Sequence, residues 1–237
     1  MMISRGKTKM QSTSIDSKRN AEATRYALLR RLAPAMRHEM AGGFQPVIML
    51  ATIVEKRLLS ASPDFSTLVK NSNEMRTFAI DATHSSLDLM GWLAFDDRER
   101  VSLGQGIKDA LHLLTNELSF RGFKFVNQTG GVIAEVERDH LRGVFVAALL
   151  ALTDAAASPA SILLTVNQDG QDMLVTISLT DFPADLGTIT PHEEFQIGLA
   201  AYRKIDWDDV QAIADVDGLS ITREARSVTL RLPTSAS

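Results

Sequence analysis

Apolar residues recur at intervals of three and four along the first part of the chain. Between about Ala21 and Ser60 they stand at Leu29, Leu32, Met36, Met40, Phe44, Val47, Ala51, Val54 and Leu58. This spacing predicts one long amphipathic helix. Pro34, the Gly42-Gly43 pair and Pro46 are expected to bend or loosen it around His38, because proline removes a backbone donor and glycine lowers helix stability.

A second apolar stripe follows the turn and capping signal Ser-Ala-Ser-Pro-Asp at 60 to 64. Its members are Leu68, Met75, Phe78, Ala82, Leu89 and Leu93. Two long helices joined by a short turn form an antiparallel hairpin. Because a hairpin has too little mutual surface to bury two apolar stripes, the pattern predicts that a second copy completes a dimeric four-helix bundle with two-fold symmetry.

Beyond residue 98, strand patterns alternate with helical ones. We expect strands at Val101–Leu103, Phe123–Val126, Ser161–Val166, Leu174–Thr180, Leu219–Arg223 and Val228–Leu232, and helices over 105–120, 138–156 and 194–214. This order predicts an α/β sandwich with one mixed sheet covered by helices, so the whole chain is α+β. The expected segments are a flexible basic tail at 1–17, the helical hairpin at 18–98 and the sandwich at 99–237.

Composition and charge exclude several classes of chemistry and of binding partner. The chain has no cysteine, which excludes disulfides and thiolate chemistry. It has no run of about 18 apolar residues and no apolar leader, so we expect a cytoplasmic protein with no membrane partner. Residues 1–62 carry 11 Lys and Arg against 4 Asp and Glu, but no interleaved aromatics, which argues against a nucleic-acid partner. No phosphate-binding loop, dinucleotide fingerprint or zinc-protease motif is present, and no metal site is expected.

His38 is the strongest candidate for a reactive side chain in the first helix. It lies two residues from both Met36 and Met40, about 200° around the helix from them, and should face solvent. A neutral imidazole is a nucleophile near pH 7, and Glu39 is placed to fix the tautomer that leaves one ring nitrogen free. On periodicity alone, the favoured interpretation is an ordinary exposed histidine beside an acid.

The other histidines are weaker candidates. His84, on the second helix, also has a phase that can face solvent. His112, His140 and His192 are interpreted as structural or surface residues.

A helical hairpin followed by a small α+β sandwich resembles the catalytic core of two-component sensor histidine kinases. Arg37-His38-Glu39-Met40 is similar to the kinase phosphoacceptor box. The helix with Leu141–Val144 and Leu152–Ala156 resembles the one that carries the asparagine box, and Asp217–Leu219 with Val228–Pro233 resembles the closing hairpin. The resemblance spans residues 25–233, and it implies a dimerisation and phosphoacceptor domain at 18–98 and an ATPase-type domain at 99–237.

The departures from the family pattern concern the nucleotide. The two asparagines that bind its magnesium correspond to Ala147 and Ala151, and alanine has no oxygen to offer a hard cation. The first glycine box reads Asp181-Phe182-Pro183-Ala184-Asp185, so only Asp181, at the adenine position, remains. The later glycine-rich lid is replaced by 195–203, with one Gly198. The ATPase domain is therefore expected to be degenerate, without effective ATP binding.

A further departure lies beside His38. Gly42 and Gly43 stand where the family has a water-positioning Thr or Asn followed by a proline. The resemblance therefore implies no effective phosphatase activity toward a partner.

Three functions remain open. The favoured one is a histidine phosphotransferase-like protein of a phosphorelay, a homodimer that passes a phosphoryl group between His38 and response-regulator aspartates. No cofactor is expected on the chain itself, because the partner receiver domain brings the magnesium. The alternatives are a divergent ATP-dependent sensor histidine kinase that uses Asp181, and a non-catalytic pseudokinase that binds a regulator through the hairpin.

Overall fold

The chain forms two compact units. The structure is a computed structural model that describes residues 4–93, 99–156, 159–181 and 202–234, with side chains from Ile15 onward. The hairpin unit is Ala33–Phe95, and the α/β unit is Met1–Leu32 together with Asp96–Ser237. Side chains of the first helix up to Leu32 are buried within the α/β unit.

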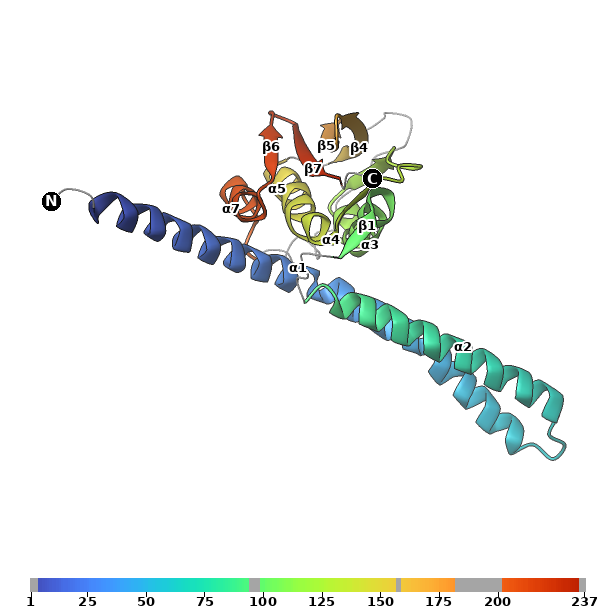
Figure 1. Ribbon diagram of the computed structural model, residues 1–237. Coiled ribbons are helices and arrows are strands. Elements are labelled where there is room, and N and C mark those ends of the chain that lie inside the picture. Colours follow the sequence, from blue (N-terminus) through green and yellow to red (C-terminus); the bar gives the residue numbers. More distant parts are fainter. Residues whose placement is uncertain (1–3, 94–98, 157–158, 182–201, 235–237) are drawn as a thin grey trace. The chain divides into compact units, whose positions relative to one another are not determined.

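Helix α1, Ser4–Leu58, runs through both units (Figure 1). It begins well before Ala21, in the segment expected to be a flexible tail. Residues 7–33 contain no glycine or proline, so nothing in that stretch stops a helix. The helix also continues past Pro34 and Pro46, although we expected both to loosen it.

The predicted hairpin is confirmed by helix α2, Phe65–Met90, which follows a short turn. Asp64 caps α2, because its carboxylate accepts hydrogen bonds from the backbone N–H groups of Ser66 and Thr67. Hydrogen bonds from the Thr67 and Ser66 hydroxyls and from these N–H groups lower the pKa of Asp64 to about 2. The capping signal in the sequence therefore sets where the second helix starts.

The α/β unit contains one five-stranded mixed sheet in the order β2-β4-β5-β7-β6. Its strands are β2 Phe123–Asn127, β4 Ala160–Asp169, β5 Asp172–Thr180, β6 Ser220–Arg223 and β7 Ser227–Pro233. β2 and β4 run parallel, and the other neighbours are antiparallel. The predicted mixed sheet is confirmed.

Alternate residues of the central strands form the core. The register pairs Leu164 with Ile177 and Val175 with Leu230, and all four side chains are fully buried. Helix α3, Leu103–Phe120, has its own buried stripe and contacts β2. Helix α5, Val146–Ala155, contacts β7 and is buried from Val146 to Thr153.

Three elements differ in detail from the sequence prediction. Strands β1, Arg100–Ser102, and β3, Glu135–Glu137, form a separate antiparallel pair; β3 was not predicted, because Glu-Val-Glu is too short and polar to stand out. The helix expected over 138–156 consists of α4, Arg138–His140, a π-helical turn, Leu141–Phe145, and α5.

Helix α7, Trp207–Asp217, starts later than the helix expected over 194–214. Asp206 and Asp209 form a reciprocal capping box that fixes this start. The helix ends at Gly218, whose left-handed backbone, with φ of 68°, favours glycine. The earlier part of the expected helix, up to residue 201, lies outside the described residues.

His140 is expected to make the stability of the α/β unit depend on pH. It is buried, its Nε2 lies 3.2 Å from a carboxylate oxygen of Glu137, and its Nδ1 has no hydrogen-bond partner among the described residues. Burial lowers the pKa of His140 despite the attraction of Glu137 and Asp217. The unfolded chain therefore binds the proton more readily, and the free energy of unfolding should fall as the pH drops below about 6.5.

Urea unfolding at pH 7.5 and 5.5 tests this expectation. The midpoint should drop at pH 5.5 in the unmodified protein and drop less in His140→Gln. The exposed His112 gives a control, so His112→Gln should keep the full pH dependence. An identical pH dependence in His140→Gln and the unmodified protein would remove His140 as the cause.

Candidate functional site

His38 lies on α1 in the hairpin unit, and its side chain is exposed, as the helical phase predicted. Met36, Met40 and Glu39 are half-buried, and Arg37 is exposed. The imidazole therefore stands in solvent, with an arginine and a carboxylate as its neighbours in sequence.

Helix α1 presents three faces in the hairpin unit. Leu50 is buried, and Gly43, seven residues earlier, faces α2 so closely that a Cβ there would lie 3.4 Å from the Cβ of Ala82. Phe44 lies on an apolar but exposed face. At 100° per residue, His38 is about 120° from Leu50 and about 120° from Phe44. The histidine therefore lies away from the intrachain contact at Leu50 and from Phe44, while Met49, which is 57% exposed, lies about 20° from it around the helix.

Gly42, one helical turn after His38, leaves open space. A Cβ added there would meet no atom within 4 Å. No side chain at this position can hold a water molecule near the imidazole.

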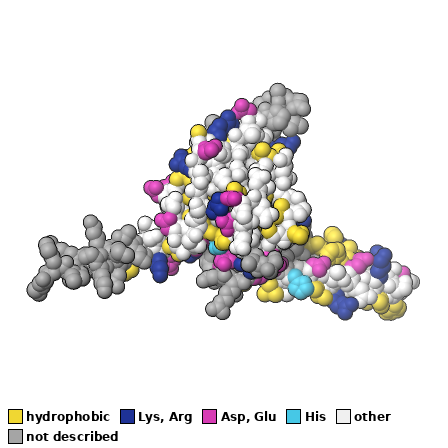
Figure 2. All heavy atoms as spheres, turned by 45° about the horizontal axis from the view of Figure 1, so that its top comes forward, with side chains coloured by type: hydrophobic (Ala, Val, Ile, Leu, Met, Phe, Trp, Pro, Cys, Tyr) yellow, Lys and Arg dark blue, Asp and Glu magenta, His cyan; other side chains and the backbone are white. Residues whose placement is uncertain are grey.

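The hairpin exposes large apolar side chains that it does not bury itself (Figure 2). On α2 they form a stripe with Phe65 69% exposed, Val69 61%, Ile80 48%, Leu87 62% and Met90 56%. On α1, Ile48 is 67% exposed and Phe44 41%. The buried contacts of α2 use other residues, namely Leu68, Asn71, Ala82 and Leu89. Each helix thus has one apolar face inside the hairpin and one left in solvent.

The remaining histidines are distributed over both units. His84 is exposed on α2, as its phase suggested, and His112 is exposed on α3. His140 is buried, and His192 lies outside the described residues. The structure therefore leaves His84 as the second exposed histidine of the hairpin unit.

The residues at the expected magnesium position do not fit a nucleotide-bound cation. Ala147 and Ala151 on α5 are 0% and 1% exposed and belong to the hydrophobic core. Neither lines a described cavity, and neither has an oxygen ligand to offer. Among the described residues, no group of three or more His, Asp or Glu side chains could hold a metal ion. Within the same ranges, no helix is long and apolar enough to span a bilayer.

Asp181 lies at the end of β5 beside a cavity of about 460 Å³. Its carboxylate is 91% exposed and forms an ion pair of 2.8 Å with Arg226, which precedes β7. The cavity is lined by apolar groups such as Leu152 and Leu179 and by Arg223, whose guanidinium lies over the Trp207 ring at 4.5 Å. The other glycine-box positions and most of the lid, 182–185 and 195–201, lie outside the described residues.

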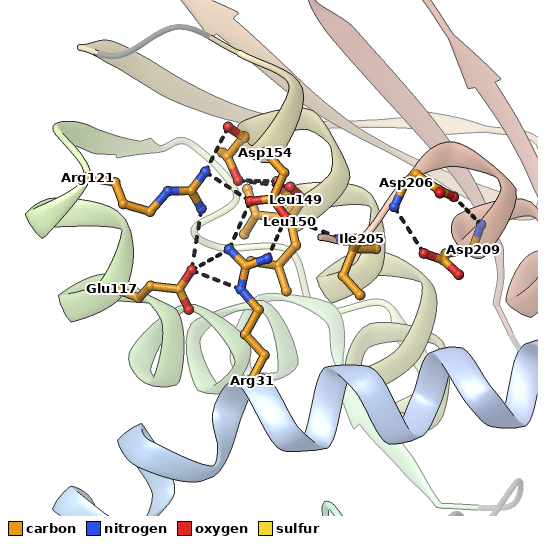
Figure 3. Close-up of polar contacts among 10 residues, drawn as sticks. Arg31, Glu117, Arg121, Leu149, Leu150, Asp154, Ile205, Asp206 and Asp209 are labelled. Atoms are coloured by element: carbon orange, nitrogen blue, oxygen red, sulfur yellow. Dashed lines mark hydrogen bonds and ion pairs between the residues drawn. The ribbon is translucent and has the colours of Figure 1, made fainter. Parts of the chain in front are cut away.

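Four charged side chains of the α/β unit form a buried cluster that is joined by hydrogen bonds and ion pairs (Figure 3). We call Arg31, Glu117, Arg121 and Asp154 the charge quartet; their side chains are 4%, 12%, 9% and 6% exposed. Arg31 donates to both oxygens of Asp154, at 2.5 and 2.8 Å, and to Glu117 at 2.5 and 3.0 Å. Arg121 lies 2.9 Å from Asp154 and 3.3 Å from Glu117.

Backbone groups add to the hydrogen bonds of the quartet, and none of its fully buried side-chain nitrogen or oxygen atoms lacks a partner. Asp154 also accepts the backbone N–H of Ile205 at 3.2 Å, and Arg121 donates to the carbonyl of Thr153 at 2.8 Å. Burial alone would lower the pKa of Arg31, but its bonds to Asp154 and Glu117 outweigh this and raise that pKa. The pKa of Arg121 is lowered by burial, and repulsion by Arg31 adds to this against the attraction of Asp154.

The sequence analysis did not identify the quartet. One signal was available for Arg31, which lies three residues after Leu28 on the buried face of α1. Asp154 likewise interrupts a strongly apolar helix. Nothing in the sequence indicated that Arg31 meets Glu117 and Asp154, because these residues lie 86 and 123 positions further along the chain.

Comparison with known proteins gives matches of structure alone. No family model and no curated protein matches the chain. The catalytic domain of histidine kinase ThkA is similar, with a TM-score of 0.40 and 14% identity over 59% of this chain and 98% of that chain. The Acinetobacter baumannii histidine kinase AdeS matches with a TM-score of 0.40 and 15% identity, over 79% of this chain and 96% of its own.

A histidine kinase from Burkholderia phymatum covers 87% of this chain and 99% of its own, with a TM-score of 0.38 and 17% identity. These are likenesses of structure at 17% sequence identity or below.

Proposed function

We propose that this chain is a histidine phosphotransferase-like protein of two-component signalling, with His38 as the phosphoryl acceptor. The observation that carries the proposal is the exposed imidazole of His38 on α1, within the Arg37-His38-Glu39-Met40 motif. The open space at Gly42 supports transfer rather than hydrolysis, because no side chain there positions water.

The proposed reaction is a reversible exchange between two side chains. The unprotonated ring nitrogen of His38 attacks the phosphorus of a receiver aspartyl phosphate. A phosphorus–nitrogen bond forms, the phosphorus–oxygen bond breaks, and the receiver recovers its carboxylate. Glu39 stabilises the positive charge that develops on the ring, and the reverse step passes the phosphoryl group to another receiver. The magnesium for both steps comes with the receiver.

ATP has no place in the proposed reaction. The alanines at 147 and 151 offer no ligand to magnesium. The alternative of a divergent kinase is favoured by one observation, the cavity beside Asp181. If the chain does not transfer a phosphoryl group, the remaining alternative is a pseudokinase that binds a regulator.

The functional molecule is proposed to be a homodimer formed by the hairpin. The exposed stripe of α2 and the exposed face of α1 with Phe44 and Ile48 together need a partner with an apolar surface. A second copy supplies the same two helices and closes a four-helix bundle. His38 is about 120° around α1 from Phe44 and about 80° from Ile48, so we expect it to stay accessible to a receiver at the edge of such a bundle.

The first test of this function replaces His38. His38→Ala should abolish acid-labile labelling from phosphorylated receiver domains of the same host. It should leave the fold and the dimer intact, because an exposed helix histidine contributes little to packing and alanine is a better helix former. Glu39→Gln should slow transfer about 100-fold, because the amide cannot stabilise the charged ring.

His84→Ala is the matched control, since His84 is also exposed on the hairpin, and it should transfer normally. Label that persists in His38→Ala and disappears in His84→Ala would exclude His38 as the acceptor. A receiver that binds but labels neither protein would favour the pseudokinase.

The second test measures nucleotide binding. With no magnesium ligand at 147 and 151, we expect a dissociation constant for Mg-ATP above about 1 mM, or less than about 4 kcal/mol of binding free energy. Calorimetry on the full chain measures it directly. Micromolar binding that is lost in Asp181→Ala would favour the divergent kinase.

The third test concerns assembly. Ile48→Glu should convert the dimer to monomer without unfolding it, because this side chain is exposed within one chain and would be buried without a partner charge in the bundle. Light scattering gives the mass. Gln45→Glu, an exposed change on the same helix away from the apolar face, should remain dimeric. An unmodified protein with a mass of 25.9 kDa would contradict the dimer.

A further inference from the structure

Residues 15–32 of α1 pack against the α/β unit along one face of the helix. The buried side chains are Ala21, Thr24, Leu28, Arg31 and Leu32, at 0%, 1%, 3%, 6% and 1% exposure. They are spaced by three and four residues, except for the adjacent pair at the end. This first half of α1 is therefore part of the α/β unit, although the same helix continues to His38.

Polar contacts along this face join α1 to several elements of the unit. The Thr24 hydroxyl donates to Asp209 of α7 at 2.8 Å, and Arg25 forms an ion pair with Asp217 at the end of α7. Arg31 reaches Glu117 of α3 and Asp154 of α5. Asp154 in addition holds the backbone of Ile205, which lies just before α7. One helix is thus bonded to the three helices α3, α5 and α7.

The charge quartet contains two arginines and two carboxylates, so its formal charges cancel. A buried ion cluster of this kind is tolerated only when every charge is compensated and hydrogen-bonded. Sliding α1 by one residue in one direction would put Leu32 in the place of Arg31 and leave both carboxylates with Arg121 alone. The opposite slide would bring Arg30 to the carboxylates, but it would bury Arg31 in the place of Leu32, which is 1% exposed. The quartet and the apolar contacts together therefore permit one register of α1 on the unit.

We infer that the quartet is a lock that fixes the first half of α1 to the α/β unit, and that holding this helix is the task of the unit in this chain. The carboxylate of Asp154 accepts hydrogen bonds from Arg31, Arg121 and the backbone of Ile205, which all belong to this chain. In this role the domain binds the chain's own helix, and Arg31 and Asp154 are its positioning residues. The role is independent of phosphoryl transfer at His38 and goes beyond the function proposed above.

The test uses charge balance in the full-length protein. Arg31→Met leaves two carboxylates against one arginine, and Asp154→Asn leaves two arginines against one carboxylate. Each should lower the Tm by about 10 °C, because breaking a buried ion pair uncovers an unpaired charge. Hydrogen exchange over residues 15–32 should become about 100-fold faster in each. Arg30→Met, at the exposed neighbouring position, should change neither quantity.

The double variant Arg31→Met/Asp154→Asn distinguishes a lock from ordinary packing. It leaves Arg121 paired with Glu117, so its loss in Tm should be clearly smaller than the sum of the two single losses. Additive losses, or an Arg31→Met protein that matches Arg30→Met in exchange, would overturn the lock. If Arg31→Met does not fold, recovery of the folded protein in the double variant supports the lock and continued failure overturns it. Each readout is independent of phosphoryl labelling, so the proposed function can fail while the lock holds.

Discussion

The burial of Arg31 is the constraint on which the arrangement of the α/β unit depends. A guanidinium with 4% of its side chain exposed needs carboxylates on the elements around it, and it finds them on α3 and α5. Asp154 also forms an ion pair with the second arginine, Arg121, and accepts a hydrogen bond from the backbone N–H of Ile205 just before α7. The helices around Arg31 are thus held both by the pairing of buried charges and by hydrophobic packing.

The sequence predicted most of the elements but not all of their partners. Alternating strands and the Asp64 cap predicted the sheet and the start of α2 because these signals are local. The stripe on α1 predicted a buried face, but it could not show that Leu32 packs in one unit while Leu50 packs in the other. The apolar periodicity of a helix predicts that one of its faces is buried, but it does not identify the element that packs against that face.

The same distinction holds for the site. The exposure of His38 followed from its phase against Met36 and Met40. The pairing of Asp181 with Arg226 could not be predicted, because it depends on β5 and β7 being neighbours in the sheet. The exposure of a helical side chain was therefore predictable from the local sequence, and a contact between distant strands was not.

The long separations along the chain give the two units different histories during synthesis. The hairpin closes through contacts between consecutive helices, so it can form as soon as α2 has left the ribosome. The first half of α1 emerges before all of these partners, which follow up to 192 residues later, with Asp154 coming 123 residues after Arg31. This part of α1 is therefore among the last to be packed, and until then its apolar and charged face is exposed to chaperones and to misfolding.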